Sequence, residues 1–208
     1  MSLTRFCLVR HGETEWNAVG RIQGTTDIDL NDKGRWQASM VAQALADAGI
    51  TAIYSSDLKR AANTAKIIAE QLALEPRPVP QLRERNYGLF EGMSYEEARR
   101  LHPEAYACYE RRDRYYNYES GESLENVQAR AAGVMENLLA THRGETVAIV
   151  LHGGVMDAIY RFATGLALED KRYFAIPNAG LNWLVHDEQG WRVESWADTQ
   201  HLEKPDLD

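Results

Sequence analysis

Charged and imidazole side chains follow two apolar runs of the sequence, at points where buried β-strands are expected to end. Arg10 and His11 come directly after Phe6–Val9, and His152 comes directly after Thr146–Leu151. Core segments seldom place an arginine beside a histidine. However, an arginine fork binds phosphate oxygens, and a neutral imidazole can attack phosphorus. The residue types and their positions therefore indicate phosphoryl-transfer chemistry.

Further candidates follow the other apolar runs. Arg60 lies in the first turn of a predicted helix, whose N-terminus favours phosphate, and Glu84 lies after a third strand, where its carboxylate could transfer protons. Taken alone, Arg60 could belong to a solvated helix face and Glu84 to a surface ion pair. Gly12 would let a phosphate approach the backbone. Neutral hydrogen-bond donors to a substrate are expected at Asn17, Gln23, Gly24 and Gly153.

Either His11 or His152 could be the nucleophile. Arg10 and Asn17, which are close to His11 in the sequence, favour His11. His152 would then donate a hydrogen bond to the phosphoryl group, and the amide of Gly153 could add another. The alternative for His152 is a buried histidine bonded to the backbone. The second ring nitrogen of His11 needs an acceptor, which the sequence does not identify.

Alternating strand and helix patterns position these candidates. They predict an α/β fold, a three-layer sandwich with a mainly parallel central sheet and helices on both faces, so that the candidates converge at the carboxyl edge of the sheet. Asn31 and Ser56 are the expected N-caps of the first two helices. Strands are expected over Arg5–Val9, Thr51–Tyr54, Arg77–Pro80 and Thr146–Leu151, helices over Asp32–Ala48, Asp57–Leu74, Leu124–Thr141 and Val155–Thr164, and a closing hairpin over Leu181–His186 and Trp191–Ala197.

The segment Met93–Glu122 has a different character, because it is rich in Arg, Glu and Tyr and has no strand pattern. We expect a small helical insertion over the carboxyl edge of the sheet, within a single domain that spans residues 1–208. Its tyrosines could pack the insertion or line a pocket, and helical spacing favours packing. The tail after Ala197 is polar and is expected to be loosely packed. These tyrosines are Tyr106, Tyr109, Tyr115, Tyr116 and Tyr118.

The overall composition restricts the class of partner. The chain of 208 residues has a net charge of −8, which disfavours nucleic acid and anionic membrane surfaces as partners. Two cysteines imply no disulfide framework and fit a cytoplasmic protein, and neither a signal-peptide pattern nor an apolar run of membrane-spanning length is present. Gly-rich nucleotide loops and metal-site motifs are also missing from the sequence.

Four motifs in this order resemble those of the histidine phosphatase superfamily, the phosphoglycerate mutase-like proteins. They are Leu8–Asn17 (LVRHGETEWN), Ser55–Ala65 (SSDLKRAANTA), Glu84–Gly88 (ERNYG) and His152–Gly154 (HGG), and the resemblance spans about Thr4–Leu202. It implies that His11 takes up the phosphoryl group, that Glu84 transfers protons, and that no metal or other cofactor is required. It also implies that Arg10, Arg60 and His152 bind the phosphoryl group.

The resemblance divides the expected activity between two reactions. A compact insertion, a short tail and Glu119–Glu125, which contains Gly-Glu-Ser, favour a phosphomonoesterase acting on a small phosphorylated metabolite. Tyr87 in the ERNYG motif and the pair Arg111 and Arg112 favour a phosphoglycerate mutase, which would need a bisphosphoglycerate primer. A third alternative, a binding module without activity, would be expected to lack a catalytic residue. The sequence leaves open a monomer or a homodimer.

Overall fold

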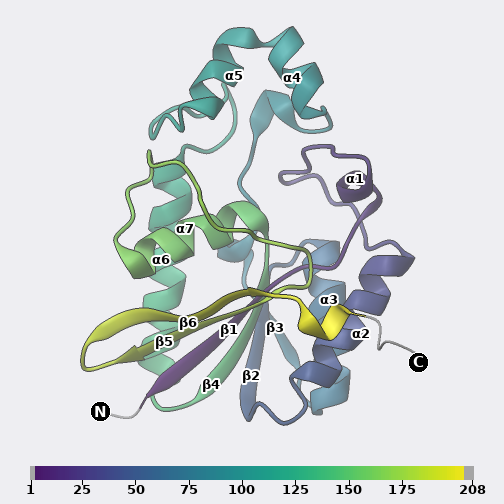
Figure 1. Ribbon diagram of the computed structural model, residues 1–208, viewed down its shortest axis with the longest axis vertical. Helices are drawn as coiled ribbons and strands as arrows, with labels where there is room; N and C mark the ends of the chain where they lie inside the picture. Colours follow the sequence, from purple (N-terminus) through teal and green to yellow (C-terminus); the bar gives the residue numbers. More distant parts are fainter. Residues whose placement is uncertain (1–2, 204–208) are drawn as a thin grey trace.

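A six-stranded sheet forms the centre of the molecule in the computed structural model of the chain, which describes residues 3–203 (Figure 1). The strand order is β3-β2-β4-β1-β5-β6. The strands β3, β2, β4 and β1 run parallel, and β5 and β6 form an antiparallel hairpin at one side. The strands are β1 (Thr4–Arg10), β2 (Ile50–Ser55), β3 (Pro76–Pro78), β4 (Thr146–Leu151), β5 (Leu181–Asp187) and β6 (Gly190–Asp198).

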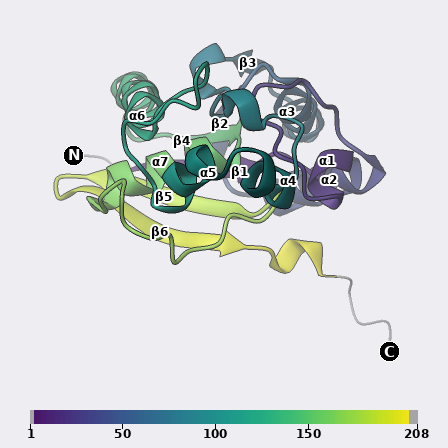
Figure 2. The same cartoon turned by 90° about the horizontal axis from the view of Figure 1, so that it is seen from above.

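Helices cover both faces of the sheet, which confirms the predicted α/β sandwich (Figure 2). Helices α6 and α7 pack on one face, and α2 and α3 pack on the other. Among the described residues, no helix is long and apolar enough to cross a membrane. The helices are α1 (Glu15–Ala18), α2 (Asp32–Ala44), α3 (Lys59–Leu72), α4 (Tyr95–Leu101), α5 (Pro103–Glu110), α6 (Leu124–Thr141) and α7 (Gly153–Thr164), with short 3-10 turns η1 (Pro80–Leu82), η2 (Gly88–Phe90) and η3 (Gln200–Leu202).

Alternation along the central strands builds the two apolar cores. In β1, Phe6 and Leu8 point to the α6–α7 face, whereas Cys7 and Val9 point to the α2–α3 face. Successive side chains of a strand point to opposite faces, so a strand that is covered on both sides is apolar throughout. This explains the uninterrupted apolar runs that predicted β1 and β4.

The pairing of β1 with β4 brings the candidate residues together. Arg10 lies opposite Leu151, and the amide of His11 donates to the carbonyl of Leu151 at 3.0 Å. Both strands therefore end at the same level, and His152 follows beside His11. The sheet thus places the two histidines at one carboxyl edge, as the sequence predicted.

Several predicted boundaries are wrong. Helix α3 begins at Lys59, and its N-cap residue is Leu58 without a side-chain bond; the hydroxyl of Ser56 instead accepts from the amide of Leu58 at 3.3 Å. Helix α2 has the predicted N-cap, Asn31, but ends at Ala44. The short helix α1 lies inside the first motif and was not predicted.

The tail is better packed than expected. Residues 190–198 complete β6, and η3 follows, with Leu202 packed on the α2–α3 core. The imidazole of His201 bonds the carbonyl of Ala179 at 2.9 Å. The polar composition of the tail gave no sign of this packing, because only Leu202 and one ring nitrogen of His201 anchor the turn.

The insertion lies above the carboxyl edge of the sheet, at the top of Figure 1. Helices α4 and α5 form it, and it has a small core of its own that contains Phe90, Tyr106 and Tyr118. Tilted aromatic contacts therefore hold the insertion together and join it to Phe90, whose ring centroid lies 5.1 Å from that of Tyr118. The predicted packing role is confirmed for Tyr106 and Tyr118.

Candidate active site

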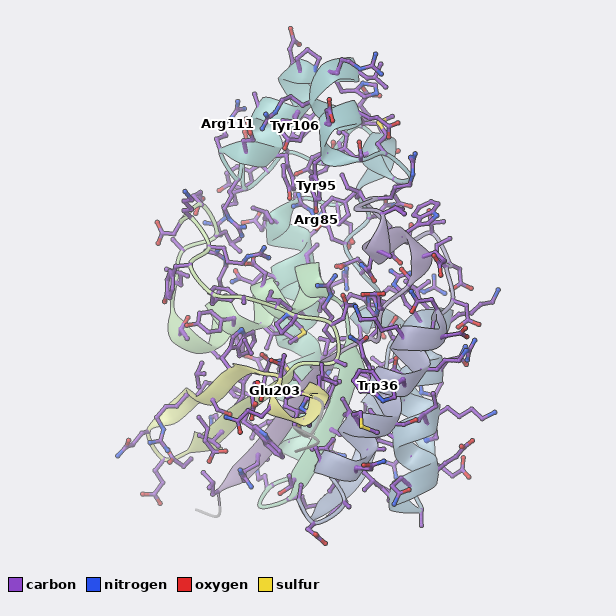
Figure 3. All side chains as sticks on the ribbon, turned by 45° about the vertical axis from the view of Figure 1, so that its right-hand side comes forward. Trp36, Arg85, Tyr95, Tyr106, Arg111 and Glu203 are labelled. Carbon is purple, nitrogen blue, oxygen red and sulfur yellow. The ribbon has the colours of Figure 1, made fainter. Side chains whose placement is uncertain are left out.

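A cavity of about 390 Å³ lies where the strands end, bounded by the sheet edge and the insertion. Figure 3 labels two of its lining residues, Tyr95 at the start of α4 in the insertion and Arg85 below it. Two predicted residues do not line it: His152 is buried beside His11, and Arg111 lies at the margin of the insertion. The predicted residues that line the cavity are Arg10, His11, Asn17, Gln23, Gly24, Arg60, Glu84, Tyr87, Arg112 and Gly153.

His11 has a defined tautomer because of one hydrogen bond. Its Nδ1 lies 2.7 Å from the carbonyl oxygen of Gly12, so we assign the proton to Nδ1. The lone pair then lies on Nε2. Burial, followed by the charges of Arg60 and Arg10, holds the pKa of His11 well below that of a free imidazole. The ring is therefore neutral near pH 7.

His152 has the opposite arrangement. Its Nδ1 accepts from Nε of Arg60 at 3.2 Å, so the proton lies on Nε2. Within residues 3–203, this buried Nε2 has no hydrogen-bond partner. The ring centroids of His152 and His11 are 5.1 Å apart. His152 thus presents an unused donor next to the lone pair of His11.

Arg60 is fully buried and held on three sides. Besides the bond to His152, its Nη1 donates to the carbonyl of Thr26 at 2.8 Å and its Nη2 to that of Gly24 at 2.7 Å. Burial lowers the pKa of Arg60, but a guanidinium stays charged in proteins. A fixed positive charge therefore faces the cavity from the first turn of α3.

The Arg10 side of the cavity is organised by the loop before β5. Nη1 of Arg10 donates to the carbonyl of Ile176 at 2.7 Å, and within residues 3–203 its buried Nε has no partner. The side-chain Nδ2 of Asn178 donates to the carbonyl of His11 at 2.9 Å. In addition, the side-chain oxygen of Asn17 accepts from the Thr14 amide at 3.2 Å. The side-chain NH2 of Asn17 therefore stays available to a substrate.

Glu84 sits on the N-terminus of α7. Its carboxylate accepts from the Gly154 amide at 3.0 and 3.1 Å and from the Arg85 amide at 2.8 Å. A Cβ at position 154 would lie 2.5 Å from Oε1 of Glu84, so only glycine allows this approach. The second glycine of the HGG motif therefore serves the carboxylate, a role that sequence reasoning missed.

Gly154→Ala is expected to lower kcat about 10²-fold, because the added methyl group displaces the Glu84 carboxylate, and misplacement by about 1 Å costs this much. The measurement is steady-state hydrolysis of an alkyl phosphate. Gly133→Ala is the matched control, because a Cβ there meets no atom within 4 Å. Equal activity in Gly154→Ala and the control would contradict the inference that close contact with Gly154 positions the Glu84 carboxylate for catalysis.

Gly12 is required for a reason different from the predicted one. A Cβ at this position would lie 2.3 Å from the carbonyl oxygen of Gly34, at the start of α2. The amide of Gly12 donates to the hydroxyl of Thr64 at 3.1 Å. Close packing against α2 and α3 therefore accounts for this glycine.

The structure separates the arginine pair. Arg111 is exposed and pairs with Asp113 at 3.0 Å, away from the cavity. Arg112 lines the cavity, but it pairs with Asp157 of α7 at 2.6 Å and donates to the carbonyl of Leu168 at 2.7 Å. The fold therefore brings only Arg112 of the pair to the cavity, and Arg112 already forms an ion pair with Asp157 there.

Several lining residues were not predicted. Arg85 is buried against the ring of Tyr118, 4.7 Å from its centroid, whereas Arg83 binds Asp57 on the surface. Lys171 and Arg172 reach the cavity from the loop between α7 and β5. No sequence signal distinguished them, because loop cations are usually solvated. The other unpredicted polar or aromatic lining residues are Arg21, Tyr95, Glu110 and Asp157.

Acid is expected to destabilise the fold through the two histidines. Burial first, and then neighbouring positive charge, lowers the pKa of His11 and of His152 well below the ordinary value of about 6.5, which the unfolded chain regains. Below that pH the unfolded chain binds more protons. The contribution of these two histidines to the free energy of unfolding should therefore be constant above neutral pH and fall as the pH drops, by up to about 1.4 kcal/mol per pH unit for each histidine.

Denaturant unfolding between pH 7.5 and 5.5 measures this dependence. His152→Gln should reduce the slope by the contribution of one proton, because the unfolded chain then has one imidazole fewer to protonate. A free energy of unfolding that does not change over this pH range in the unsubstituted protein would contradict the buried neutral state of both rings.

Comparisons with known proteins identify the family of the chain. A family model of the histidine phosphatase superfamily (branch 1) matches residues 6–199. The metal-independent phosphoserine phosphatase of Arabidopsis thaliana is 39% identical over 96% of this chain and 84% of its own length. Phosphoglycerate mutase-like protein 4 of the same organism is 39% identical over 95% of this chain and 86% of its own length.

A solved structure is similar over the same range. A variant of the Entamoeba histolytica phosphoserine phosphatase, in complex with phosphoserine, has a TM-score of 0.88 and 29% identity, and the match covers 96% of this chain and all of that one (100%). The predicted family and the predicted phosphatase activity are confirmed, so the non-enzymatic alternative is not supported. The chain belongs to the histidine phosphatase superfamily and is a phosphomonoesterase of that family.

Proposed function

We propose that the chain hydrolyses a small phosphate monoester through a phosphohistidine on His11. In the first step Nε2 of His11 attacks phosphorus, the bond to the ester oxygen breaks, and Glu84 protonates the leaving alcohol. In the second step Glu84 takes a proton from water, whose oxygen attacks phosphorus and breaks the P–Nε2 bond. The sum is ester plus water to alcohol plus inorganic phosphate.

The tautomers support this choice of nucleophile. The single observation that carries it is the bond from Nδ1 of His11 to the Gly12 carbonyl, because it leaves a lone pair on Nε2. Nδ1 of His152 is already occupied by Arg60, so its Nε2 has a proton and no lone pair. A donor next to a nucleophile stabilises the charge that develops on the phosphoryl oxygens. Arg10, Arg60 and His152 would share that role.

The position of Glu84 supports proton transfer. Backbone amides of Arg85 and Gly154 hold its carboxylate, which lines the same cavity as His11. Glu122 orders the same loop, because its backbone amide donates to the carbonyl of Asn86 at 2.8 Å and its carboxylate pairs with Arg130 at 2.8 Å. The Gly-Glu-Ser element therefore supports the segment that carries the proton donor.

We propose that the reaction needs no metal and no other cofactor. Buried Arg60, half-buried Arg10 and a histidine donor can neutralise the phosphoryl charge that metal ions neutralise elsewhere. In addition, the Arabidopsis relative is named metal-independent. Dialysis against a chelator is expected to leave kcat/KM unchanged within twofold. A loss that added Mg²⁺ or Zn²⁺ restores would contradict the proposal.

The arginine pair favours hydrolysis over the mutase reaction. Asp157 neutralises Arg112, and Arg111 lies outside the cavity. Tyr87 does line the site and packs against the ring of Tyr118, with centroids 6.2 Å apart. Because one relative is named phosphoglycerate mutase-like, the mutase reaction is the alternative to test. A cavity of 390 Å³ is near the lower end for ligand sites, which fits a small metabolite.

Phosphorus NMR with 3-phosphoglycerate and a trace of bisphosphoglycerate primer distinguishes the two reactions. Release of inorganic phosphate, or hydrolysis of another small ester such as phosphoserine, is expected. Formation of the 2-phospho isomer without inorganic phosphate would overturn the proposal and make the chain a mutase.

The oxidation state of the two cysteines is relevant to the cellular location of the protein. Cys7 is a buried free thiol, and Cys108 is also free. Free thiols persist in a reducing environment. We therefore propose a cytoplasmic location, and a fractionation experiment that recovers the protein outside the cytoplasm would contradict it.

A further inference from the structure

The cavity has more positive charge than a phosphoryl group uses. Seven arginine and lysine side chains line it, against three carboxylates. All three carboxylates already have partners: Glu84 binds the amide of Gly154, Asp157 binds Arg112, and Glu110 binds Arg99 at 2.7 Å. The excess of positive charge is therefore not neutralised by the lining itself, although the whole chain is acidic.

Two of these cations lie on a different loop from the two histidines. Arg10 and Arg60 accompany His11, at the phosphoryl end. Lys171 and Arg172 lie on the loop between α7 and β5, and within residues 3–203 neither forms an ion pair with a carboxylate. The cavity thus has a second cationic end.

The loop that carries this second end is held in place. It rises from the end of α7 toward the insertion, as Figure 1 shows. Nε of Arg112 donates to the Leu168 carbonyl at 2.7 Å, and Arg114 reaches Glu169 at 4.0 Å. Arg112 also forms an ion pair with Asp157, which connects it to α7. The insertion therefore fixes the loop, and Arg112 acts as a positioning residue.

The two ends belong to one electrostatic unit. Arg10 and Arg172 line the same cavity. Burial lowers the pKa of Arg10, and the positive charge of Arg172 makes a smaller contribution in the same direction. A ligand that spans the cavity would relieve the repulsion at both ends. A phosphate alone would relieve it at one end.

Resting on the proposed function, we propose that Lys171 and Arg172 form a subsite for a second anionic group, carried by the leaving alcohol of the substrate. The Arg172 fork can bind a carboxylate or a phosphate with two parallel bonds. These two residues would then determine specificity: esters whose alcohol is charged bind across the cavity, and esters of neutral alcohols use the phosphoryl end only.

Calorimetric binding in the His11→Ala background tests this subsite, since no ester is then hydrolysed. Phosphoserine against phosphoethanolamine, and 3-phosphoglycerate against glycerol 3-phosphate, are two pairs that differ by a carboxylate. A third pair, 1,3-propanediol bisphosphate against propyl phosphate, differs by a phosphate. In at least one pair, we expect the member with the additional carboxylate or phosphate to bind about tenfold more tightly. This difference corresponds to one charge-assisted hydrogen bond.

Arg172→Gln and Lys171→Gln, alone and together, should reduce that preference to within about threefold, mainly by weakening the binding of the member that has the additional anionic group. Arg100→Gln is the matched control, because it removes the same charge from the exposed end of α4. Equal affinity within all three pairs, or a preference that survives the double substitution, would overturn the proposal. Phosphorus NMR of the same mixtures detects any hydrolysis, so failure of the proposed chemistry can be distinguished from failure of the subsite.

Discussion

His11→Ala is expected to lower kcat/KM for every phosphate ester by at least about 10⁴-fold, the largest effect of any single substitution in this chain. The ring supplies the only lone pair that the described site directs at phosphorus, because Nε2 of His152 has a proton. Removing a covalent nucleophile has effects of this size in other enzymes. Steady-state release of inorganic phosphate from p-nitrophenyl phosphate measures it.

The matched control removes another imidazole. His186→Ala lies on β5, outside the cavity lining, and should keep full activity. Thermal unfolding of His11→Ala checks that the fold is kept, because the ring makes one side-chain hydrogen bond, to the adjacent Gly12 carbonyl. Activity within tenfold of the unsubstituted protein would exclude His11 as the nucleophile.

Glu84→Gln is expected to separate substrates by their leaving groups. For an alkyl ester such as phosphoserine, kcat/KM should fall about 10³-fold, since an alkoxide leaves slowly unless it is protonated. For p-nitrophenyl phosphate the loss should be less than about tenfold, because an acidic phenol leaves without a proton. The parameter kcat/KM is the right one, because it includes steps up to the first irreversible one and excludes hydrolysis of the phosphoenzyme.

The substitution preserves the shape of the site. A glutamine oxygen can still accept from the Gly154 amide, so displacement of the side chain should not contribute. Comparing the two esters in the same variant is an internal control for folding. Equal losses on both esters would contradict the role of Glu84 as proton donor.

The sequence predicted well the layers of the fold and the position of the candidate residues at one edge of the sheet. The apolar runs of β1 and β4 and the periodicity of α6 determine the sheet edge, and the residues that follow each strand meet there. Arg10, His11, Arg60 and His152 could be predicted because strand ends are fixed by local pattern. Their chemistry also differs sharply from that of core residues.

The tautomers of the two histidines could not be predicted. They depend on which ring nitrogen meets Gly12 and which meets Arg60, and these contacts arise from the packing of α3 against the strand ends. Similarly, Arg83 and Arg85 flank Glu84 symmetrically in sequence. The structure buries Arg85 against Tyr118 and leaves Arg83 on the surface with Asp57.

Contacts between segments far apart in the sequence also determine which residues line the outer part of the cavity. Arg111 and Arg112 look alike in sequence, but only Arg112 has a positive φ, of 53°, which turns it toward Asp157 and the loop after α7. Lys171 and Arg172 are ordinary loop cations until the insertion is placed beside them. Sequence patterns record local periodicity, so a contact between two loops leaves little signal.

The phosphohistidine is tested most directly by trapping it. In Glu84→Gln the phosphoenzyme should accumulate, because the group that would take a proton from the attacking water is missing. Rapid quenching with ³²P-labelled p-nitrophenyl phosphate, followed by peptide mass spectrometry, locates the label. We expect an acid-labile, base-stable phosphoryl group on His11. Turnover without any labelled protein, or a label on His152, would contradict the mechanism.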